Sequence, residues 1–346
     1  MSRILEEDFD YIISNSTKFD QLQNSTILIT GATGLIGSLI VKMLDYTNKK
    51  YNYNIVIIAL VRNQKKAEEI LKGYDVIYIS GNICSLPIID EKIDYIIHCA
   101  AITKSKEMVD NPVEVIDGIV NGTQNILKLA LNKQVKSLVY LSSMEVYGKT
   151  DPGLEFVSED DVGYIEMQNV RSCYPLSKRM AENICYSYHA EYNVPVKMAR
   201  LAQTFGAGIL TNETRIFSHI AKSVINNTDI ILHTDGLSYG NYCYTADAIA
   251  GLLLLLISGK DGEIYNIANE STCMTIKQMA NLVAKNIANE NISVQFDLSK
   301  ANENGYAAPV KMKLSSNKLR NLGWKPKYGL EEMYCRMISY MREEKV

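Results

Sequence analysis

The sequence lacks any Cys-x-x-Cys pair, although seven cysteines are scattered along its 346 residues. Their odd number and irregular spacing argue against a disulfide framework and predict reduced thiols in a cytoplasmic protein. The four histidines also lack the spacing of metal ligands. We therefore expect neither a disulfide-stapled fold nor a catalytic metal.

Charge of one sign and long apolar runs are equally scarce. The formal net charge is −3, so the chain is not basic enough to follow a phosphate backbone, and we expect no nucleic-acid partner. The longest apolar run extends from Ala248 to Ile257, far short of the roughly 20 residues of a membrane-spanning helix. The first residues include Glu6, Glu7 and Asp8, unlike a secretory signal. We expect no membrane partner.

Strand-like and helix-like segments alternate over the first 200 residues. Six short apolar runs predict buried strands at 26–30, 55–61, 75–79, 94–101, 135–143 and 196–200. Helices are expected between them at 35–44, 64–72, 111–132 and 174–192. This alternation predicts an α/β fold, a Rossmann-type doubly wound parallel sheet covered by helices on both faces.

The chain divides into three parts on this pattern. Residues 1–24 form an N-terminal extension with a short helix at 4–13, and 25–205 form the Rossmann domain. Residues 206–346 form a smaller C-terminal α/β lobe, from which residues 240–265 return to the first domain. In this lobe we expect helices near 214–226, 245–258 and 275–289, a strand near 230–233 and a polar stretch at 297–306.

A glycine-rich turn follows the first predicted strand and opens a helix, with the sequence GATGLIG at 31–37. Glycines at these places permit a tight turn and a close approach of the backbone to a pyrophosphate. The helix start then offers free N–H groups to the phosphates. The context predicts a dinucleotide site whose contacts are Gly31, Thr33, Gly34, Leu35, Ile36 and Gly37.

The end of the second predicted strand bears on the choice of cofactor. An acidic residue there would bind the 2′-hydroxyl of NAD, whereas an arginine accommodates the 2′-phosphate of NADP. Val61 occupies the expected acidic position and Arg62 follows it. We expect an NAD(P) cofactor, with NADP slightly favoured over NAD.

Tyr174 and Lys178 are four residues apart in a predicted helix, so their side chains share one face. A free phenol has a pKa of about 10, and bringing it near 7 requires about 4 kcal/mol of preference for the phenolate. A neighbouring buried cation supplies part of that preference. The pair is therefore a candidate acid/base for the oxidation of an alcohol, with Ser143 as its partner.

Together these motifs resemble the extended short-chain dehydrogenase/reductase family, specifically its NAD(P)-dependent nucleotide-sugar epimerases, dehydratases and decarboxylases. The resemblance covers residues 25–330 and rests on GATGLIG at 31–37, HCAA at 98–101, NGTQN at 121–125, SSMEVYG at 142–148, YPLSK at 174–178 and RLAQTFG at 200–206. It implies that Tyr174 is the acid/base on a sugar hydroxyl, that Lys178 binds the nicotinamide ribose, and that Ser143 hydrogen-bonds the sugar oxygen.

The resemblance also implies further cofactor contacts, which are Asn82, Ile83, Ala100, Ala101, Thr103, Asn121, Leu141 and Leu201. The implied substrate is a nucleotide-diphosphate sugar. Relatives commonly pair two helices into a homodimer, and these correspond to residues 111–132 and 174–192.

Residues after Ser143 bear on the reaction. Sugar 4,6-dehydratases usually have an acid where this chain has Met144, and a thioether cannot donate a proton to a departing hydroxyl. Glu145 is retained as a further catalytic candidate, which leaves decarboxylation, epimerisation and an atypical dehydration open. The alternative interpretation of Glu145 is a capping or salt-bridging residue at the strand exit. A net NADPH-dependent reductase of a 4-keto sugar and a non-catalytic cofactor sensor are the alternative functions.

The substrate anchor also departs from the family pattern. Gly240 stands where relatives often have an arginine that clasps the diphosphate, which leaves Arg215 as the candidate for that contact. The expected substrate contacts are Ser143, Met144, Glu145, Gln203, Arg215 and Asn241.

Overall fold

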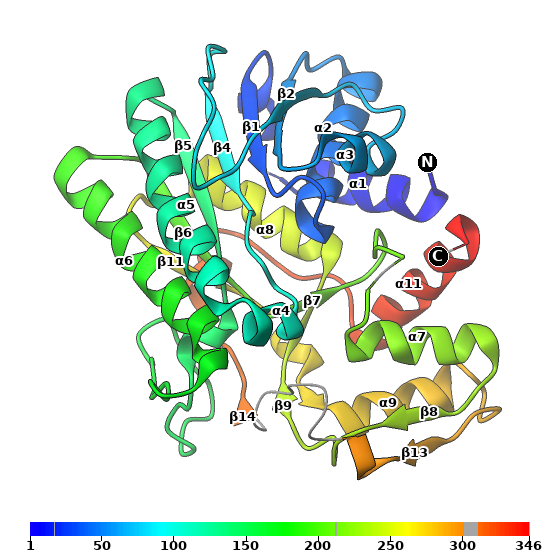
Figure 1. The fold of residues 1–346 in the computed structure, drawn as a ribbon. Helices are drawn as coiled ribbons and strands as arrows, with labels where there is room; N and C mark the ends of the chain where they lie inside the picture. The colour runs from blue at the N-terminus through cyan, green and yellow to red at the C-terminus, as the bar shows by residue number, and fades with distance from the viewer. Residues whose placement is uncertain (17, 212, 301–310, 346) are drawn as a thin grey trace.

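A seven-stranded parallel sheet forms the centre of the molecule, with strand order β11-β6-β5-β4-β1-β2-β3 (Figure 1). Its strands are β1 (Thr26–Thr30), β2 (Val56–Val61), β3 (Ile77–Ser80), β4 (Tyr95–His98), β5 (Ser137–Ser143), β6 (Val196–Leu201) and β11 (Ile264–Ile267). The computed structural model describes residues 1–16, 18–211, 213–300 and 311–345, so the end of the polar stretch expected at 297–306 lies outside the described residues. The predicted Rossmann-type architecture is confirmed.

Helices cover both faces of this sheet because successive strand residues point to opposite sides. Ile27 and Ile29 of β1 pack into a core with α2 (Leu35–Tyr51), α8 (Thr245–Ser258) and α11 (Leu330–Glu344). Leu28, between them, packs on the other face with α5 (Pro112–Lys133) and α6 (Cys173–Tyr192). The apolar run that includes Leu252 and Leu255 is a buried helix, as expected.

Helix α2 is longer than the sequence predicted and ends at Tyr51 instead of residue 44. Its last two turns are polar, but they are fixed by tertiary contacts. Asp45 is buried and accepts a hydrogen bond from the backbone N–H of Asp75. Asn48 accepts from the N–H of Ile55 and donates to its carbonyl, directly before β2. These bonds hold the end of α2 against the segments before β2 and β3. The apolar periodicity of the sequence does not indicate a helix over these last turns.

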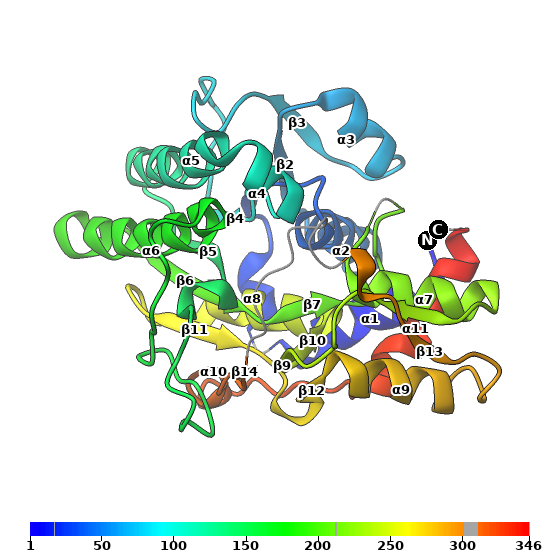
Figure 2. The same ribbon diagram turned by 60° about the horizontal axis from the view of Figure 1, so that its bottom comes forward.

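The N-terminal residues form an integral layer of the fold. Helix α1 (Arg3–Asn15) lies beside α8 and α11, and both chain ends lie close together in Figures 1 and 2. Asp8 is buried and accepts hydrogen bonds from Arg336 and Tyr244, each at 2.7 Å. Tyr11 donates a 2.7 Å hydrogen bond to Asp247 at the start of α8. The extension therefore anchors the last helix to the sheet domain.

The C-terminal lobe consists of short helices and strands below the sheet in Figure 1. Its larger elements are α7 (Ile216–Asn226), β8 (Ile230–Leu232), α9 (Ile276–Asn286) and β13 (Val294–Phe296). Small sheets pair β10 (Tyr242–Tyr244) with β7 (Gln203–Phe205), and join β12 (Met274–Thr275), β9 (Tyr239–Gly240) and β14 (Lys311–Met312). The remaining elements are α3 (Gln64–Ile70), α4 (Ser105–Asp110), α10 (Asn317–Arg320), and the 3₁₀ turns η1 (Phe19–Leu22), η2 (Met144–Tyr147), η3 (Val170–Ser172), η4 (Glu270–Thr272) and η5 (Leu298–Lys300).

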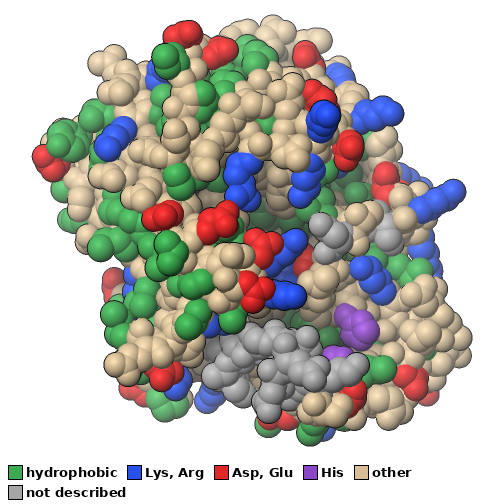
Figure 3. Space-filling model, viewed as in Figure 1, with side chains coloured by type: hydrophobic (Ala, Val, Ile, Leu, Met, Phe, Trp, Pro, Cys, Tyr) green, Lys and Arg blue, Asp and Glu red, His purple; other side chains and the backbone are tan. Residues whose placement is uncertain are grey.

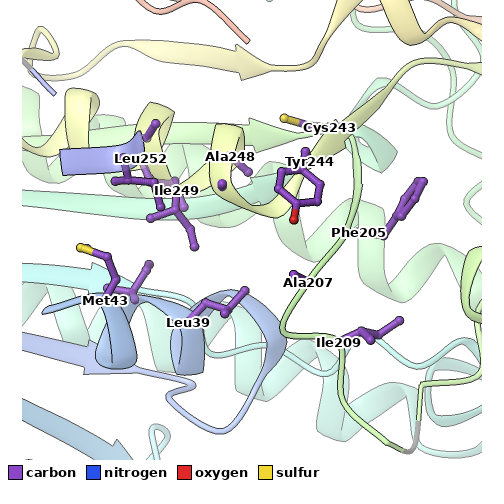
Figure 4. Close-up of a cluster of buried hydrophobic side chains, with 14 of the residues drawn as sticks. Leu39, Met43, Phe205, Ala207, Ile209, Cys243, Tyr244, Ala248, Ile249 and Leu252 are labelled. Carbon is purple, nitrogen blue, oxygen red and sulfur yellow. The ribbon is translucent and has the colours of Figure 1, made fainter. Parts of the chain in front are cut away.

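An apolar junction joins the lobe to the sheet domain. Figure 4 shows side chains of α2 and α8 beside the segment that follows β7, among them Leu39, Ala207 and Ile249. Phe205 at the end of β7 stacks on Phe217 of α7, with ring centroids 4.7 Å apart. This packing holds the lobe against the carboxyl ends of the strands. None of the helices in the described ranges combines the length and the apolar character that a membrane crossing requires.

Candidate active site

The glycine turn lies at the carboxyl end of β1 and leads into α2. Gly31 has φ +68°, and a Cβ there would lie 2.8 Å from the backbone nitrogen of Ala100. A side chain at Gly37 would collide with the carbonyl of Gly31. No side chain caps the helix start at Gly34. The turn therefore leaves an open backbone cradle at a helix N-terminus, which fits a dinucleotide pyrophosphate.

The neighbouring strand end is held in place by His98. Thr30 Oγ1 lies 2.7 Å from His98 Nδ1 and accepts a hydrogen bond from the N–H of Ala100 at 3.1 Å. Burial lowers the pKa of His98 to about 3, so the ring is neutral. Its role is to fix the turn that carries Ala100 and Ala101 beside the glycine cradle. Thr103 follows on the same loop, before α4.

The expected adenine contacts gather beside α5. Ile83 packs so closely on Gly122 that a Cβ at that glycine would lie 2.8 Å from the isoleucine. Asn82 accepts a hydrogen bond from the N–H of Cys84 and shapes the loop. Asn121 is exposed and donates to Asp117 of its own helix. Arg62 lies 3.3 Å from Glu114, and both side chains are exposed. A carboxylate at that position opposes a 2′-phosphate.

Lys178 is buried in the sheet side of α6, one turn after Tyr174. Its Nζ donates a 2.6 Å hydrogen bond to the carbonyl of Leu141. The same nitrogen lies 4.7 Å from the ring centroid of Tyr140 and 5.9 Å from that of Tyr174. Burial lowers the pKa of Lys178 to about 8, while the charge of Glu182 raises it. The structure thus brings the predicted tyrosine and lysine together on one face.

Tyr174 is surrounded by four polar groups. Burial raises the pKa of its phenol above the ordinary value, and the charge of Glu145 raises it further. A hydrogen bond with Ser143 and the charges of Arg171 and Arg215 lower it. Burial therefore dominates the pKa of this phenol, and the ammonium of Lys178, which was expected to lower it, donates to the carbonyl of Leu141. The structure thus places Ser143 within hydrogen-bonding reach of Tyr174.

Glu145 forms a bidentate ion pair with Arg171, a residue that the sequence argument missed. Arg171 Nη1 lies 2.8 Å from Oε2 and Nη2 lies 3.1 Å from Oε1. Ser143 Oγ accepts a hydrogen bond from the Glu145 N–H at 3.2 Å and starts the turn η2. Arg171 lies in η3, directly before the helix of Tyr174. The sequence signal that could have found Arg171 is its position three residues before Tyr174, close to one turn of a helix.

Three of the expected substrate contacts, Gln203, Met144 and Arg215, differ in how exposed their side chains are and in whether they already have a partner. Gln203 is exposed at the start of β7, in register with Tyr242, and Met144 is partly buried in the turn after Ser143. Leu201, an expected cofactor contact, ends β6 beside Ser143 of β5. Arg215 is half-exposed, and its guanidinium contacts Glu213 at 2.6 and 3.0 Å. The guanidinium of Arg215, the expected diphosphate contact, is therefore already paired.

Asn241 is a structural residue, which corrects its expected role in substrate binding. Its side chain is buried, donates to the carbonyl of Leu314 at 2.9 Å and accepts from the N–H of the same residue at 3.1 Å. Both ends of the amide are thereby used to hold the segment after β14. Beside it, Gly240 pairs with Met312, and a Cβ at Gly240 would lie 3.2 Å from the Met312 carbonyl.

A buried ion pair joins α6, the helix that carries Tyr174 and Lys178, to strand β6. Arg200 of β6 contacts Glu182 of α6 through two hydrogen bonds of 2.9 and 2.7 Å, and both side chains are almost fully buried. Arg200 also donates to the carbonyl of Glu159. On the outer surface, Figure 3 shows acidic and basic side chains gathered across the middle of the molecule, between the sheet domain and the lobe.

Comparison with known proteins identifies the family. Residues 27–268 match the model of the NAD dependent epimerase/dehydratase family. The chain belongs to this family. Its curated relatives include UDP-glucuronic acid decarboxylase 3 of Arabidopsis thaliana, which is 30% identical over 321 residues and 92% of this chain and 89% of the relative. The dTDP-D-glucose 4,6-dehydratase of Mus musculus is 26% identical over 328 residues, which cover 92% of this chain and 88% of the relative.

Solved structures of the family share the fold. The UDP-glucose 4-epimerase of Thermotoga maritima has a TM-score of 0.78 at 20% identity, and the match covers 93% of this chain and 100% of that chain. The UDP-glucuronic acid 4-epimerase of Bacillus cereus in complex with NAD has a TM-score of 0.74 at 19% identity, with coverage of 93% and 100%. The chain is thus an enzyme of the extended short-chain dehydrogenase/reductase family, as the motifs indicated.

Proposed function

We propose that this enzyme modifies a nucleotide-diphosphate sugar through a transient 4-keto sugar, and that decarboxylation of a hexuronate is its reaction. The observation that carries the proposal is the Glu145–Arg171 ion pair beside Tyr174. This arrangement places Tyr174, which would transfer a proton to or from the C4 hydroxyl, beside two opposite charges that would face the substituent on C5. The 30% identity to UDP-glucuronic acid decarboxylases supports the choice of reaction.

The first step is oxidation at C4. Tyr174 removes the proton of the C4 hydroxyl, and Ser143 hydrogen-bonds the same oxygen as it becomes a carbonyl. A bound NAD supplies the hydride acceptor and later the hydride donor. Gly31, Gly34 and Gly37 would hold its pyrophosphate, and Lys178 would meet the nicotinamide ribose. Among cofactors we propose NAD, because Glu114 neutralises Arg62 and a relative of this fold is solved with NAD.

The second step breaks the C5–C6 bond. A C4 ketone makes the C6 carboxylate a β-keto acid, so carbon dioxide leaves and the bonding electron pair becomes the enolate of C4 and C5. A proton from solvent adds at C5 and restores the ketone, and reduction at C4, with the proton returned by Tyr174, gives a pentose. Met144 carries no proton to give, which disfavours the loss of a C6 hydroxyl and hence a standard 4,6-dehydration.

The proposal extends to the oligomeric state, the role of the C-terminal lobe and the cellular location. We propose a homodimer through α5 and α6, which lie side by side at one edge of the molecule in Figure 1. Large apolar side chains are exposed on them, namely Val113, Ile116, Met180 and Tyr186. We also propose that residues 206–346 mainly bind substrate and that the protein is cytoplasmic, in keeping with seven unpaired cysteines. Light scattering of the purified protein tests the dimer.

The proposal is tested by incubating the enzyme with NAD and UDP-glucuronate and identifying the product by NMR. We expect release of carbon dioxide and a UDP-pentose, with no net change of absorbance at 340 nm, and no product from Tyr174→Phe. A C4 epimer without carbon dioxide would replace decarboxylation by epimerisation. Lasting consumption of NADPH with a 4-keto nucleotide sugar would establish the alternative function, a net reductase. Arg62 is the residue that favours this alternative, because an arginine at this position accommodates the 2′-phosphate of NADPH.

A further inference from the structure

We propose that Arg171 is a specificity-determining residue that binds a carboxylate on C5 of the sugar, and that Glu145 holds its guanidinium in position until the sugar arrives. The inference rests on the proposed function, because it assigns the charged group of the substrate to a particular side chain.

Arg171 has unused hydrogen-bonding capacity. A guanidinium carries five N–H donors, and the contacts with Glu145 use one at Nη1 and one at Nη2. Nε is buried and has no hydrogen-bond partner among the described residues. The side chain is 17% exposed. Since Nε itself is buried, the groups available to a ligand are the second N–H of Nη1 and the second N–H of Nη2, each of which can donate a charge-assisted hydrogen bond to a carboxylate oxygen.

The location of these donors fits the proposed pose of the sugar. Glu145 donates its backbone N–H to Ser143, the hydrogen-bond partner of Tyr174, and Arg171 lies directly before the helix of Tyr174. The Tyr174 phenol would face the C4 hydroxyl. The substituent on C5 is the neighbour of that hydroxyl on the sugar ring. A charged group beside the phenol therefore meets the C5 substituent before it meets the distant diphosphate.

The other cations near the phenol are engaged elsewhere. Lys178 donates to the carbonyl of Leu141, and the Nε and Nη2 of Arg215 both contact Glu213. Glu145 alone would repel a sugar carboxylate, whereas its pair with Arg171 is neutral and leaves donors available. A neutral hydroxymethyl group at C5 would accept a hydrogen bond from the same guanidinium but would lack the attraction between two opposite charges. The arrangement therefore favours a hexuronate over a neutral hexose.

The test compares the affinities of UDP-glucuronate and UDP-glucose for the NAD-loaded protein by calorimetry. We expect Arg171→Met to weaken UDP-glucuronate binding by about 10- to 100-fold, the range of a lost charge-assisted bond, and to change UDP-glucose binding less than about threefold. Arg171→Lys should retain part of the preference. The matched control is Arg215→Met, which should affect both sugars alike.

A second variant guards against a simple folding defect. Glu145→Gln removes the carboxylate that occupies Arg171, so we expect tighter binding of UDP-glucuronate and an unchanged affinity for UDP-glucose. Equal losses for both sugars in Arg171→Met, weaker uronate binding in Glu145→Gln, or no uronate preference in the wild type would each overturn the inference. Absence of carbon dioxide release by a wild type that retains an Arg171-dependent preference would instead reject the decarboxylase proposal.

Discussion

The ammonium nitrogen of Lys178 lies 2.6 Å from the carbonyl oxygen of Leu141, so a buried hydrogen bond connects helix α6 to the last residues of strand β5. Ser143 ends the same strand, two residues after the bonded carbonyl. The lysine therefore sets the separation between the phenol on its helix and the serine hydroxyl on the strand, in addition to carrying a charge.

Replacement of this lysine should affect both roles. We expect Lys178→Met to abolish turnover and to weaken NAD binding by at least about tenfold, because a charged hydrogen-bond donor is worth about 1.5–3 kcal/mol. Calorimetric titration with NAD and a product assay measure the two effects. Lys197→Met is the control, since Lys197 is equally buried but pairs with Asp261. The same loss of NAD affinity in both variants would contradict a specific role for Lys178.

The pH dependence of turnover should have an alkaline limb near pH 8. Burial lowers the pKa of Lys178 to about 8, so its ammonium loses the proton above that pH, and Glu182 opposes this loss. We expect Glu182→Gln to move the limb to lower pH, measured as kcat/KM against pH. An unmoved limb would show that Glu182 does not act on the lysine.

A control separates this electrostatic effect from a loss of stability. Glu182→Gln leaves Arg200 buried without its partner, which costs about 3–5 kcal/mol. A double variant with Arg200→Gln removes both charges and should recover part of that stability in urea denaturation. The alkaline limb should nevertheless stay at the lower pH, because the carboxylate is still missing.

Cofactor preference should depend on Glu114. Its carboxylate lies 3.3 Å from the guanidinium of Arg62, so Glu114→Ala frees that cation and removes a charge that repels a 2′-phosphate. We expect the ratio of Kd for NADP to Kd for NAD to fall by about tenfold, in line with one charge-assisted bond. Glu107→Ala, which removes an exposed carboxylate paired with Lys104, should leave the ratio unchanged. No response to Glu114→Ala would place Arg62 outside the cofactor site.

The N-terminal helix should contribute measurably to stability. Tyr11 donates to the buried carboxylate of Asp247, which also accepts from the N–H groups of Lys327 and Tyr328. We expect Tyr11→Phe to lower the free energy of unfolding by about 1–3 kcal/mol, measured with urea. The control is Tyr46→Phe, whose hydroxyl bonds the exposed Asp10. Equal effects of both changes would mean that the Tyr11 bond is no more than a surface contact.

Much of the sheet domain was predictable because its strands are continuous buried runs between glycine turns and amphipathic helices. The bounds of six of its strands differ from the predicted bounds by three residues or fewer. Helix α11 was missed, although Met333, Met337 and Met341 recur on its buried face. Strands of two or three residues, such as β9 and β14, gave no local signal, because their pairing depends on where the lobe places them.

The residues of the candidate site also divide into those that local sequence predicts and those that depend on tertiary contacts. Tyr174 and Lys178 were predictable together because helix geometry alone puts residues i and i+4 on one face. The pair of Glu145 with Arg171 spans 26 residues and depends on how the intervening loop returns to the helix. Asn241 and Arg215 were assigned by position in a motif, but their partners, Leu314 and Glu213, were not visible in that motif.

The hydrogen bond between Asp8 and Arg336 links residues that are 328 positions apart in the sequence. The buried aspartate also accepts hydrogen bonds from Tyr244 and Tyr328. Loss of α11 would therefore leave a buried carboxylate without its charged partner, and a truncation before Arg336 should weaken the docking of α1 on α8 at the opposite end of the sequence.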